Sequence, residues 1–137
     1  MKYLFDTDVI SALMKGKPPL TLKERLAATA DQYQAISALT VFEVYYGAHR
    51  SDNPDRFIQL FESRVLPVVA VIPFDDNAAR IAGRIRASRE KIGHPIAPGD
   101  LQIAATALAA GCILVTGKTR HFIDIPCLDQ ENWLVQA

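Results

Sequence analysis

The stretch Tyr3-Leu4-Phe5-Asp6-Thr7-Asp8-Val9-Ile10 (YLFDTDVI) places two carboxylates directly after a short apolar run and then returns to apolar residues. An apolar run of this length indicates a buried strand, so Asp6 is predicted to lie at the end of that strand. Asp8 precedes Val9 and Ile10 and is predicted to be the N-cap of the following helix. In parallel α/β sheets, ligands bind beyond the carboxyl ends of the strands, which is where Asp6 is expected.

Outward from this stretch, apolar runs of strand length alternate with longer segments of helical period, which predicts a parallel sheet covered by helices. The predicted strands span residues 2–6, 35–38, 68–73, 112–116 and 126–129. The predicted helices span residues 8–15, 21–30, 40–49, 54–64, 76–92 and 100–110. Residues 1–137 are therefore predicted to form a single α/β domain, with four to five parallel strands flanked by helices on both faces.

Charge and composition restrict the classes of partner. Lys+Arg and Asp+Glu each number 15, so the net charge is zero and an anionic partner must be met by a local patch. The two cysteines lie in apolar stretches and fit a reducing compartment, and no apolar stretch reaches the roughly 18 residues that a membrane-spanning helix needs. We therefore expect a soluble, cytoplasmic protein.

Three acids are predicted to gather at the carboxyl edge of the sheet: Asp6 after the first strand, Glu43 after the second, and Asp100 at the start of the helix before the fourth. Two of them also have local explanations. Thr40-Val41-Phe42-Glu43 has the T-x-x-E pattern of a capping box, and Asp100 is an ordinary residue for a helix start.

Asp6 has no such explanation, because a buried carboxylate is unfavourable unless it is paired. Most arginines fall on one predicted helix with the spacing of a solvated face (Arg80, Arg84, Arg86 and Arg89). We therefore infer a divalent cation such as Mg²⁺ or Mn²⁺ beside Asp6, with Glu43 and Asp100 completing the site.

Four segments of the chain resemble the successive motifs of the PIN-domain family, and in particular of VapC-type toxins from bacterial toxin–antitoxin pairs. These are YLFDTDVISALMKGKPP (3–19), ISALTVFEVYYGAHR (36–50), IAPGDLQIAATALAAGCILVTGKTRHF (96–122) and IPCLDQENW (125–133). The resemblance implies a ribonuclease that uses Mg²⁺ or Mn²⁺ to hydrolyse RNA phosphodiester bonds with a metal-activated water. It further implies a VapB-like antitoxin whose tail occupies the active site, and a homodimer.

Carried over by motif, the catalytic residues implied by the resemblance are Asp6, Glu43, Asp100 and Thr116. The three acids are the implied metal ligands, and Thr116, which ends the fourth predicted strand, is the implied hydrogen-bond donor behind them. Glu43 alternatively orients the attacking water as a general base.

The last motif departs from the family pattern. The family commonly shows T-x-N here, but this chain reads Thr116-Gly117-Lys118-Thr119-Arg120-His121-Phe122, with Lys118 in the asparagine position. A lysine ammonium there either competes with a cation or holds a substrate phosphate. His121 is either a ligand that favours Mn²⁺ or a surface residue. Lys118, Arg120 and His121 are the candidate substrate contacts.

Two other functions are compatible with parts of the sequence. The D-x-D pattern of Asp6 and Asp8 is also found in haloacid-dehalogenase-like phosphatases, although Ile10 stands where that motif has threonine or valine. The second alternative is a PIN-like module, weakened in catalysis by Lys118 and His121, that binds antitoxin or RNA.

Overall fold

The computed structural model describes residues 2–135 and is built around a five-stranded parallel sheet. Its strands are β1 (Tyr3–Phe5), β2 (Gln34–Ser37), β3 (Ala70–Ile72), β4 (Ile113–Val115) and β5 (Gln130–Glu131). Their order in the sheet is β3-β2-β1-β4-β5, and every neighbouring pair is parallel. The chain leaves β1 towards β2 on one side and returns to β4 on the other, so the strand order reverses beside β1 and β4, where ligand sites of such sheets lie.

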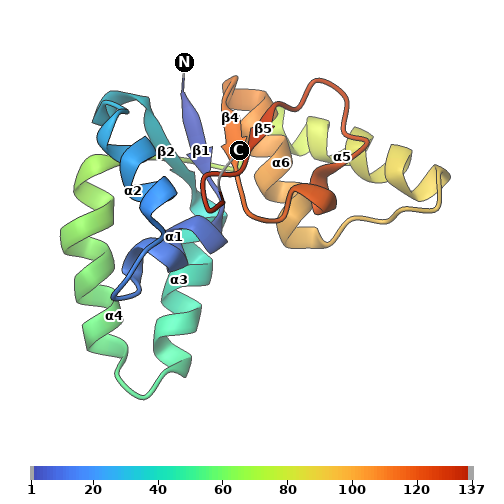
Figure 1. The fold of residues 1–137 in the computed structure, drawn as a ribbon. Coiled ribbons are helices and arrows are strands. Elements are labelled where there is room, and N and C mark those ends of the chain that lie inside the picture. The colour runs from blue at the N-terminus through green and yellow to red at the C-terminus, as the bar shows by residue number, and fades with distance from the viewer. Residues whose placement is uncertain (1, 136–137) are drawn as a thin grey trace.

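Helices cover both faces of the sheet (Figure 1). On one side lie α1 (Thr7–Met14), α2 (Leu20–Ala27), α3 (Ala38–Arg50) and α4 (Pro54–Leu60), and on the other α5 (Asp76–Lys91) and α6 (Pro98–Ala110). The parallel α/β architecture predicted from the alternating apolar runs is confirmed, with five strands. No helix of residues 2–135 combines the length and hydrophobicity that a membrane span requires.

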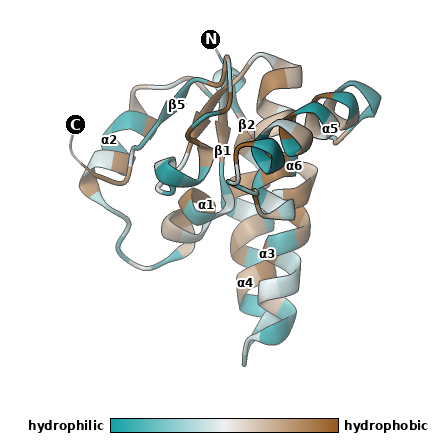
Figure 2. Ribbon diagram, turned by 90° about the vertical axis from the view of Figure 1, so that its right-hand side faces the viewer, coloured by the Kyte–Doolittle hydropathy of each residue, from teal (hydrophilic) through white to brown (hydrophobic). Residues whose placement is uncertain are grey.

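Alternating side chains of the strands divide the apolar core in two. Leu4, Ala35 and Leu114 pack on the α5 and α6 side. Phe5, Ile36 and Val115 pack on the side of α1 to α4. Figure 2 shows the strands as a hydrophobic centre between helices that also carry hydrophilic residues. Because both faces are covered, β1 and β4 have no solvated side, and the end of these strands is the nearest point at which a polar group meets water.

The register of the central strands places the predicted functional residues at one edge. Phe5 pairs with both Ile36 and Val115, so β1 and β4 end at the same level and β2 ends one residue later, at Ser37. Asp6 and Thr116 are the next residues after β1 and β4, and the Asp6 N–H donates to the Val115 carbonyl at 2.9 Å. The predicted strand-end positions of Asp6 and Thr116 are therefore confirmed.

The last predicted strand is wrong. Residues 126–127 lie in a turn, with Asp124 and Cys127 both at φ of 66°, and pairing with β4 starts only at Gln130. Left-handed backbone at Cys127, inside the predicted span, is incompatible with a strand there. The two cysteines are unpaired, and the turn leaves Cys127 exposed while Cys112 is buried.

The fourth predicted helix, residues 54–64, is shorter than expected. It ends as α4 at Leu60, and the chain continues through a π-helical turn (Phe61–Val65) and a 3₁₀ turn (Leu66–Val68). Pro67 prevents an α-helix from continuing through this segment, because proline lacks the N–H that would donate to the carbonyl four residues earlier.

Candidate active site at the ends of strands β1 and β4

Asp6 joins the end of β1 to the start of α1. It is fully buried, and its carboxylate accepts hydrogen bonds from the Thr7 N–H at 2.7 Å and from Oγ1 of Thr116 at 2.8 Å. Asp6, not Asp8, is the N-cap of α1, so the prediction for Asp8 is wrong. The helix starts one residue earlier than the apolar pattern indicated, which moves the capping position onto the strand-end acid.

Asp8 instead holds the loop that follows β4. Its Oδ2 accepts the Gly117 N–H at 2.9 Å, and a β-carbon at Gly117 would lie 2.9 Å from the same oxygen. Its Oδ1 is buried and has no hydrogen-bond partner among the described residues. Burial raises the pKa of Asp8, and the negative charge of Asp6 adds to this increase. The position therefore favours a neighbouring positive charge.

Asp100 is buried in the first turn of α6 and receives two side chains from the loop after β4. Nζ of Lys118 lies 2.9 Å from its Oδ1, and Nδ1 of His121 lies 2.9 Å from its Oδ2. Lys118 also approaches Oδ2 of Asp6, at 3.7 Å. Two acids that are 94 positions apart in the chain (6 and 100) thus share one ammonium group.

Lys118 is held as a cation by these acids. Desolvation alone would lower the pKa of its ammonium group. The hydrogen bond to Asp100 and the charges of Asp6, Asp100 and Asp8 together outweigh desolvation, so the pKa of Lys118 lies above its ordinary value. Lys118 is accordingly the positive partner that the buried Asp6 requires.

Glu43 approaches the cluster through Thr7. It lies in the second turn of α3, whose N-cap is Ser37, so the capping-box prediction is wrong. Its Oε1 accepts a hydrogen bond from Oγ1 of Thr7 at 2.6 Å, and its Oε2 would lie 3.8 Å from a β-carbon placed at Gly99. Glu43 therefore lies between the start of α1 and the start of α6.

Thr7 was not singled out from the sequence, although it stands between the two acids of the opening stretch. Its hydroxyl contacts both Glu43 and Thr40, at 2.6 and 3.0 Å. Of the three candidate substrate contacts, Lys118 and His121 reach Asp100, whereas Arg120 is exposed and forms no side-chain hydrogen bond or salt bridge with residues 2–135.

A hollow of about 340 Å³ opens beside Asp100 and His121 and is lined also by Arg89, Pro95, Ile96 and Ala97. Arg89 was expected on a solvated face but is buried. Its guanidinium donates to the carbonyls of His94 and Ile123, both at 2.7 Å. These bonds join the end of α5 to the segment after His121, which places a positive charge at the entrance to the acid cluster.

The acid cluster offers the donor chemistry that a hard divalent cation requires, but its side chains are not arranged around one. Within residues 2–135 no group of three or more His, Cys, Asp and Glu side chains is arranged to hold a metal. Lys118 stands between Asp6 and Asp100 instead, so a cation already lies at this position. The oxygens that Asp6 and Asp100 offer are carboxylate oxygens, the type that Mg²⁺ and Mn²⁺ prefer, and the unpartnered Oδ1 of Asp8 lies in the same cluster.

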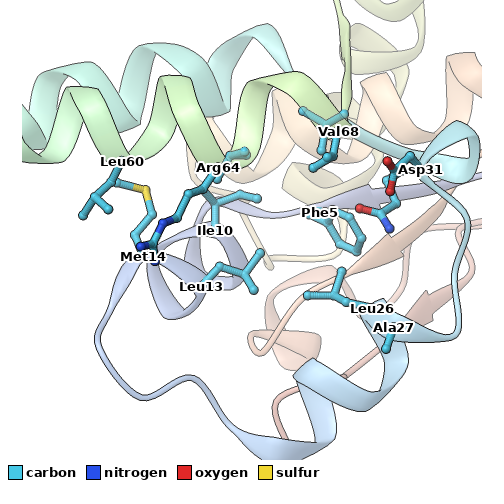
Figure 3. Close-up of a pocket in the computed structure, with 13 residues that line it drawn as sticks. Phe5, Ile10, Leu13, Met14, Leu26, Ala27, Asp31, Leu60, Arg64 and Val68 are labelled. Carbon is cyan, nitrogen blue, oxygen red and sulfur yellow. The ribbon is translucent and has the colours of Figure 1, made fainter.

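A second hollow, of about 400 Å³, lies apart from these acids, between α1, α2 and the end of α4. Figure 3 shows Phe5, Leu13 and Leu26 around it, with Arg64 and Asp31 on different sides. The sequence did not predict this hollow, because most of its lining residues are apolar and have the pattern of core residues.

Comparisons with known proteins identify relatives of the chain in sequence and in fold. The sequence profile of the PIN domain matches residues 3–126. Ribonuclease VapC2 of Haemophilus influenzae is 34% identical, over 98% of this chain and 99% of its own length. The tRNA(fMet)-specific endonuclease VapC of Shigella flexneri is 34% identical, over 97% of this chain and 98% of its own. The crystal structure of a DNA-bound VapBC from Salmonella typhimurium superimposes with a TM-score of 0.89 at 32% identity, covering 97% of this chain and 98% of that one.

Proposed function

We propose, given that the chain belongs to the PIN-domain family and to its VapC ribonucleases, that it hydrolyses RNA phosphodiester bonds with Mg²⁺ or Mn²⁺ held at the ends of β1 and β4. The observation that supports this site most strongly is the pair of buried carboxylates, Asp6 and Asp100, on either side of one positive charge. Two buried carboxylates stay ionised together at low cost only when a cation lies near both.

Each residue of the cluster has a role that follows from its contacts. A divalent cation there supplies positive charge for the phosphoryl oxygens and lowers the pKa of a bound water. Asp6 and Asp100 are its proposed ligands, and the Thr116 hydroxyl fixes the orientation of the Asp6 carboxylate. Glu43, held by Thr7, either completes the ligand set or accepts the proton of the attacking water.

We propose that the substrate is a structured RNA of the transfer-RNA class, since the relative from Shigella flexneri acts on tRNA(fMet). The phosphate backbone would enter at the hollow beside Asp100, where Arg89 and His121 line the wall. Arg120 is exposed in the same loop and is available for a further phosphate contact. Such an RNA is cytoplasmic, which agrees with the two unpaired cysteines.

The first test is cleavage of purified initiator tRNA by the purified, antitoxin-free protein with Mg²⁺ or Mn²⁺. We expect cleavage with either ion, no cleavage after chelation with EDTA, and recovery when the ion is restored. Cleavage that persists in EDTA would contradict the proposed metal-dependent reaction. A tRNA left intact while other RNAs are cut would leave the chemistry standing and overturn only the proposed substrate.

We propose that a VapB-type antitoxin neutralises the enzyme, by analogy with the VapBC complex from Salmonella typhimurium, and that part of it binds in the apolar hollow of Figure 3. The hollow is bounded by Leu13 of α1 and Leu26 of α2, and an apolar side chain of the partner would replace water there.

We also propose a homodimer. Phe42 and Tyr46 on α3 are 62% and 54% exposed and stack on one another, with Arg50 over the Tyr46 ring. Large exposed aromatic pairs of this kind are typical of interfaces. A second copy of the chain is the proposed partner for this face.

Native mass spectrometry of the chain co-expressed with a VapB-type antitoxin tests both assemblies. For the homodimer, we expect two copies of the toxin in the complex. For the antitoxin site, Leu13→Asp is expected to weaken antitoxin binding by at least about a hundredfold, because a carboxylate must then enter an apolar site. Leu20→Asp, at an exposed residue of α2, is the matched control, and circular dichroism checks that both variants fold. Equal antitoxin affinity for the two variants would place the antitoxin elsewhere.

The phosphatase alternative is wrong, because the chain belongs to the PIN-domain family. The alternative of a catalytically weakened binding module is favoured by one observation, the occupation of the acid cluster by Lys118. The cleavage assay separates it from the nuclease, since a binding module would retain RNA without cutting it.

A further inference from the structure

Lys118 is fixed at the acid cluster by its main chain as well as by its side chain. Its N–H donates to Oγ1 of Thr116 at 3.0 Å, and the same hydroxyl donates to Asp6 at 2.8 Å. Its ammonium then reaches Asp100 at 2.9 Å and Asp6 at 3.7 Å. The contact is therefore part of the loop that follows β4, and it differs from the transient ion pair of a surface lysine.

Each carboxylate oxygen of the two acids already contacts a group of the chain itself. Both oxygens of Asp100 are taken, one by Lys118 and one by His121. One oxygen of Asp6 accepts the Thr7 N–H, and the other accepts the Thr116 hydroxyl and faces Lys118. A divalent cation requires the same oxygens at about 2.0–2.1 Å, so it cannot enter while the ammonium remains between them.

We propose that Lys118 is a built-in counter-cation of this cluster, and that a divalent metal binds only by displacing its ammonium from Asp6 and Asp100. The inference rests on the proposed metal-dependent function and adds a determinant of metal affinity to it. The ammonium then compensates part of the negative charge of the metal-free cluster, and the metal competes with a tethered positive group at a very high local concentration.

Displacement is physically available to this side chain. Lys118 is 38% exposed, whereas Asp6 is almost fully enclosed, so the ammonium has a path to solvent that the carboxylates lack. A flexible four-carbon stem carries the charge away without any movement of the backbone bonds to Thr116. Once moved, the ammonium stays beside the cluster, where it repels the metal weakly through solvent.

The test is the affinity for Mn²⁺ in the absence of RNA, measured by electron paramagnetic resonance of the free ion and by the metal-induced shift of the melting temperature. The variants are Lys118→Met, which keeps the length and removes the charge, and Lys118→Asn, which keeps a hydrogen-bond donor. Lys23→Met, at an exposed lysine of α2, is the matched control for loss of one positive charge.

Both Lys118 variants are expected to bind Mn²⁺ at least about tenfold more tightly than the wild type, with a larger rise in melting temperature, while Lys23→Met binds as the wild type does. Adding Asp100→Asn to Lys118→Met should abolish this binding. Equal affinity of wild type and Lys118→Met, with binding still lost on Asp100→Asn, would overturn the counter-cation and leave the metal site intact. Absence of binding in every variant would overturn the proposed metal chemistry itself.

Discussion

Asp100→Asn is expected to lower the rate of RNA cleavage by at least about a thousandfold, the scale of losing a principal electrostatic group of an active site. The asparagine is nearly isosteric with Asp100 but removes the negative charge that faces Lys118 and, in the proposed reaction, the metal. The substitution lies in the first turn of α6, where the side chain also meets His121. The measurement is kcat/KM for a single tRNA substrate at saturating Mn²⁺.

Asp55→Asn is the matched control, because Asp55 is an exposed acid in the first turn of α4. Its cleavage rate should equal that of the wild type. If the wild type cleaves the RNA and Asp100→Asn cleaves it as fast as Asp55→Asn, Asp100 takes no part in the reaction. If none of the three proteins cleaves the RNA, the chain is the weakened binding module.

Trp133→Ala is expected to lower the free energy of unfolding by about 3–5 kcal/mol, the usual cost of deleting a large buried aromatic side chain. Trp133 is 1% exposed and packs against Tyr3 and Phe5 of β1, with ring centroids 4.9 and 5.4 Å apart. Its indole N–H donates to Glu131 at 2.9 Å, and the Arg25 guanidinium lies 4.6 Å above its ring. The substitution therefore opens a cavity beside the central strand and also releases β5.

Urea denaturation measures this change. Leu20→Ala, at a leucine that is 68% exposed, is the control and should change the unfolding free energy by less than about 0.5 kcal/mol. A loss below about 1 kcal/mol for Trp133→Ala would mean that the C-terminal segment contributes little to the folded state, contrary to the burial of its indole.

Much of the fold was predictable because the strands are short, apolar and separated by helical segments. The first four predicted strands and all six α-helices appear, with limits that differ by a few residues. The last strand was wrong because neighbouring apolar residues, Ile125 and Leu128, look like a strand while the backbone turns at Asp124 and Cys127. That the whole chain is one domain stays a prediction.

The strand-end acids were predictable from their position, but their partners were not. Asp6 and Thr116 follow paired strands, so the topology alone brings them together. The capping predictions for Asp8 and Glu43 were wrong, because acid-before-apolar and T-x-x-E patterns describe a helix start whichever residue actually caps it. The pairing of Lys118 depends on a loop conformation that no periodicity describes.

A manganese anomalous difference map tests at atomic level whether Asp6 and Asp100 hold a divalent metal in the working enzyme. Crystals of the wild type and of Lys118→Met would be soaked in Mn²⁺ and measured at the manganese absorption edge. We expect a peak between the Asp6 and Asp100 carboxylates in both, with the Lys118 ammonium moved away in the wild type. Crystals of a protein active with Mn²⁺ that show no peak there, and an unmoved Lys118 at saturating Mn²⁺, would contradict the proposed metal site.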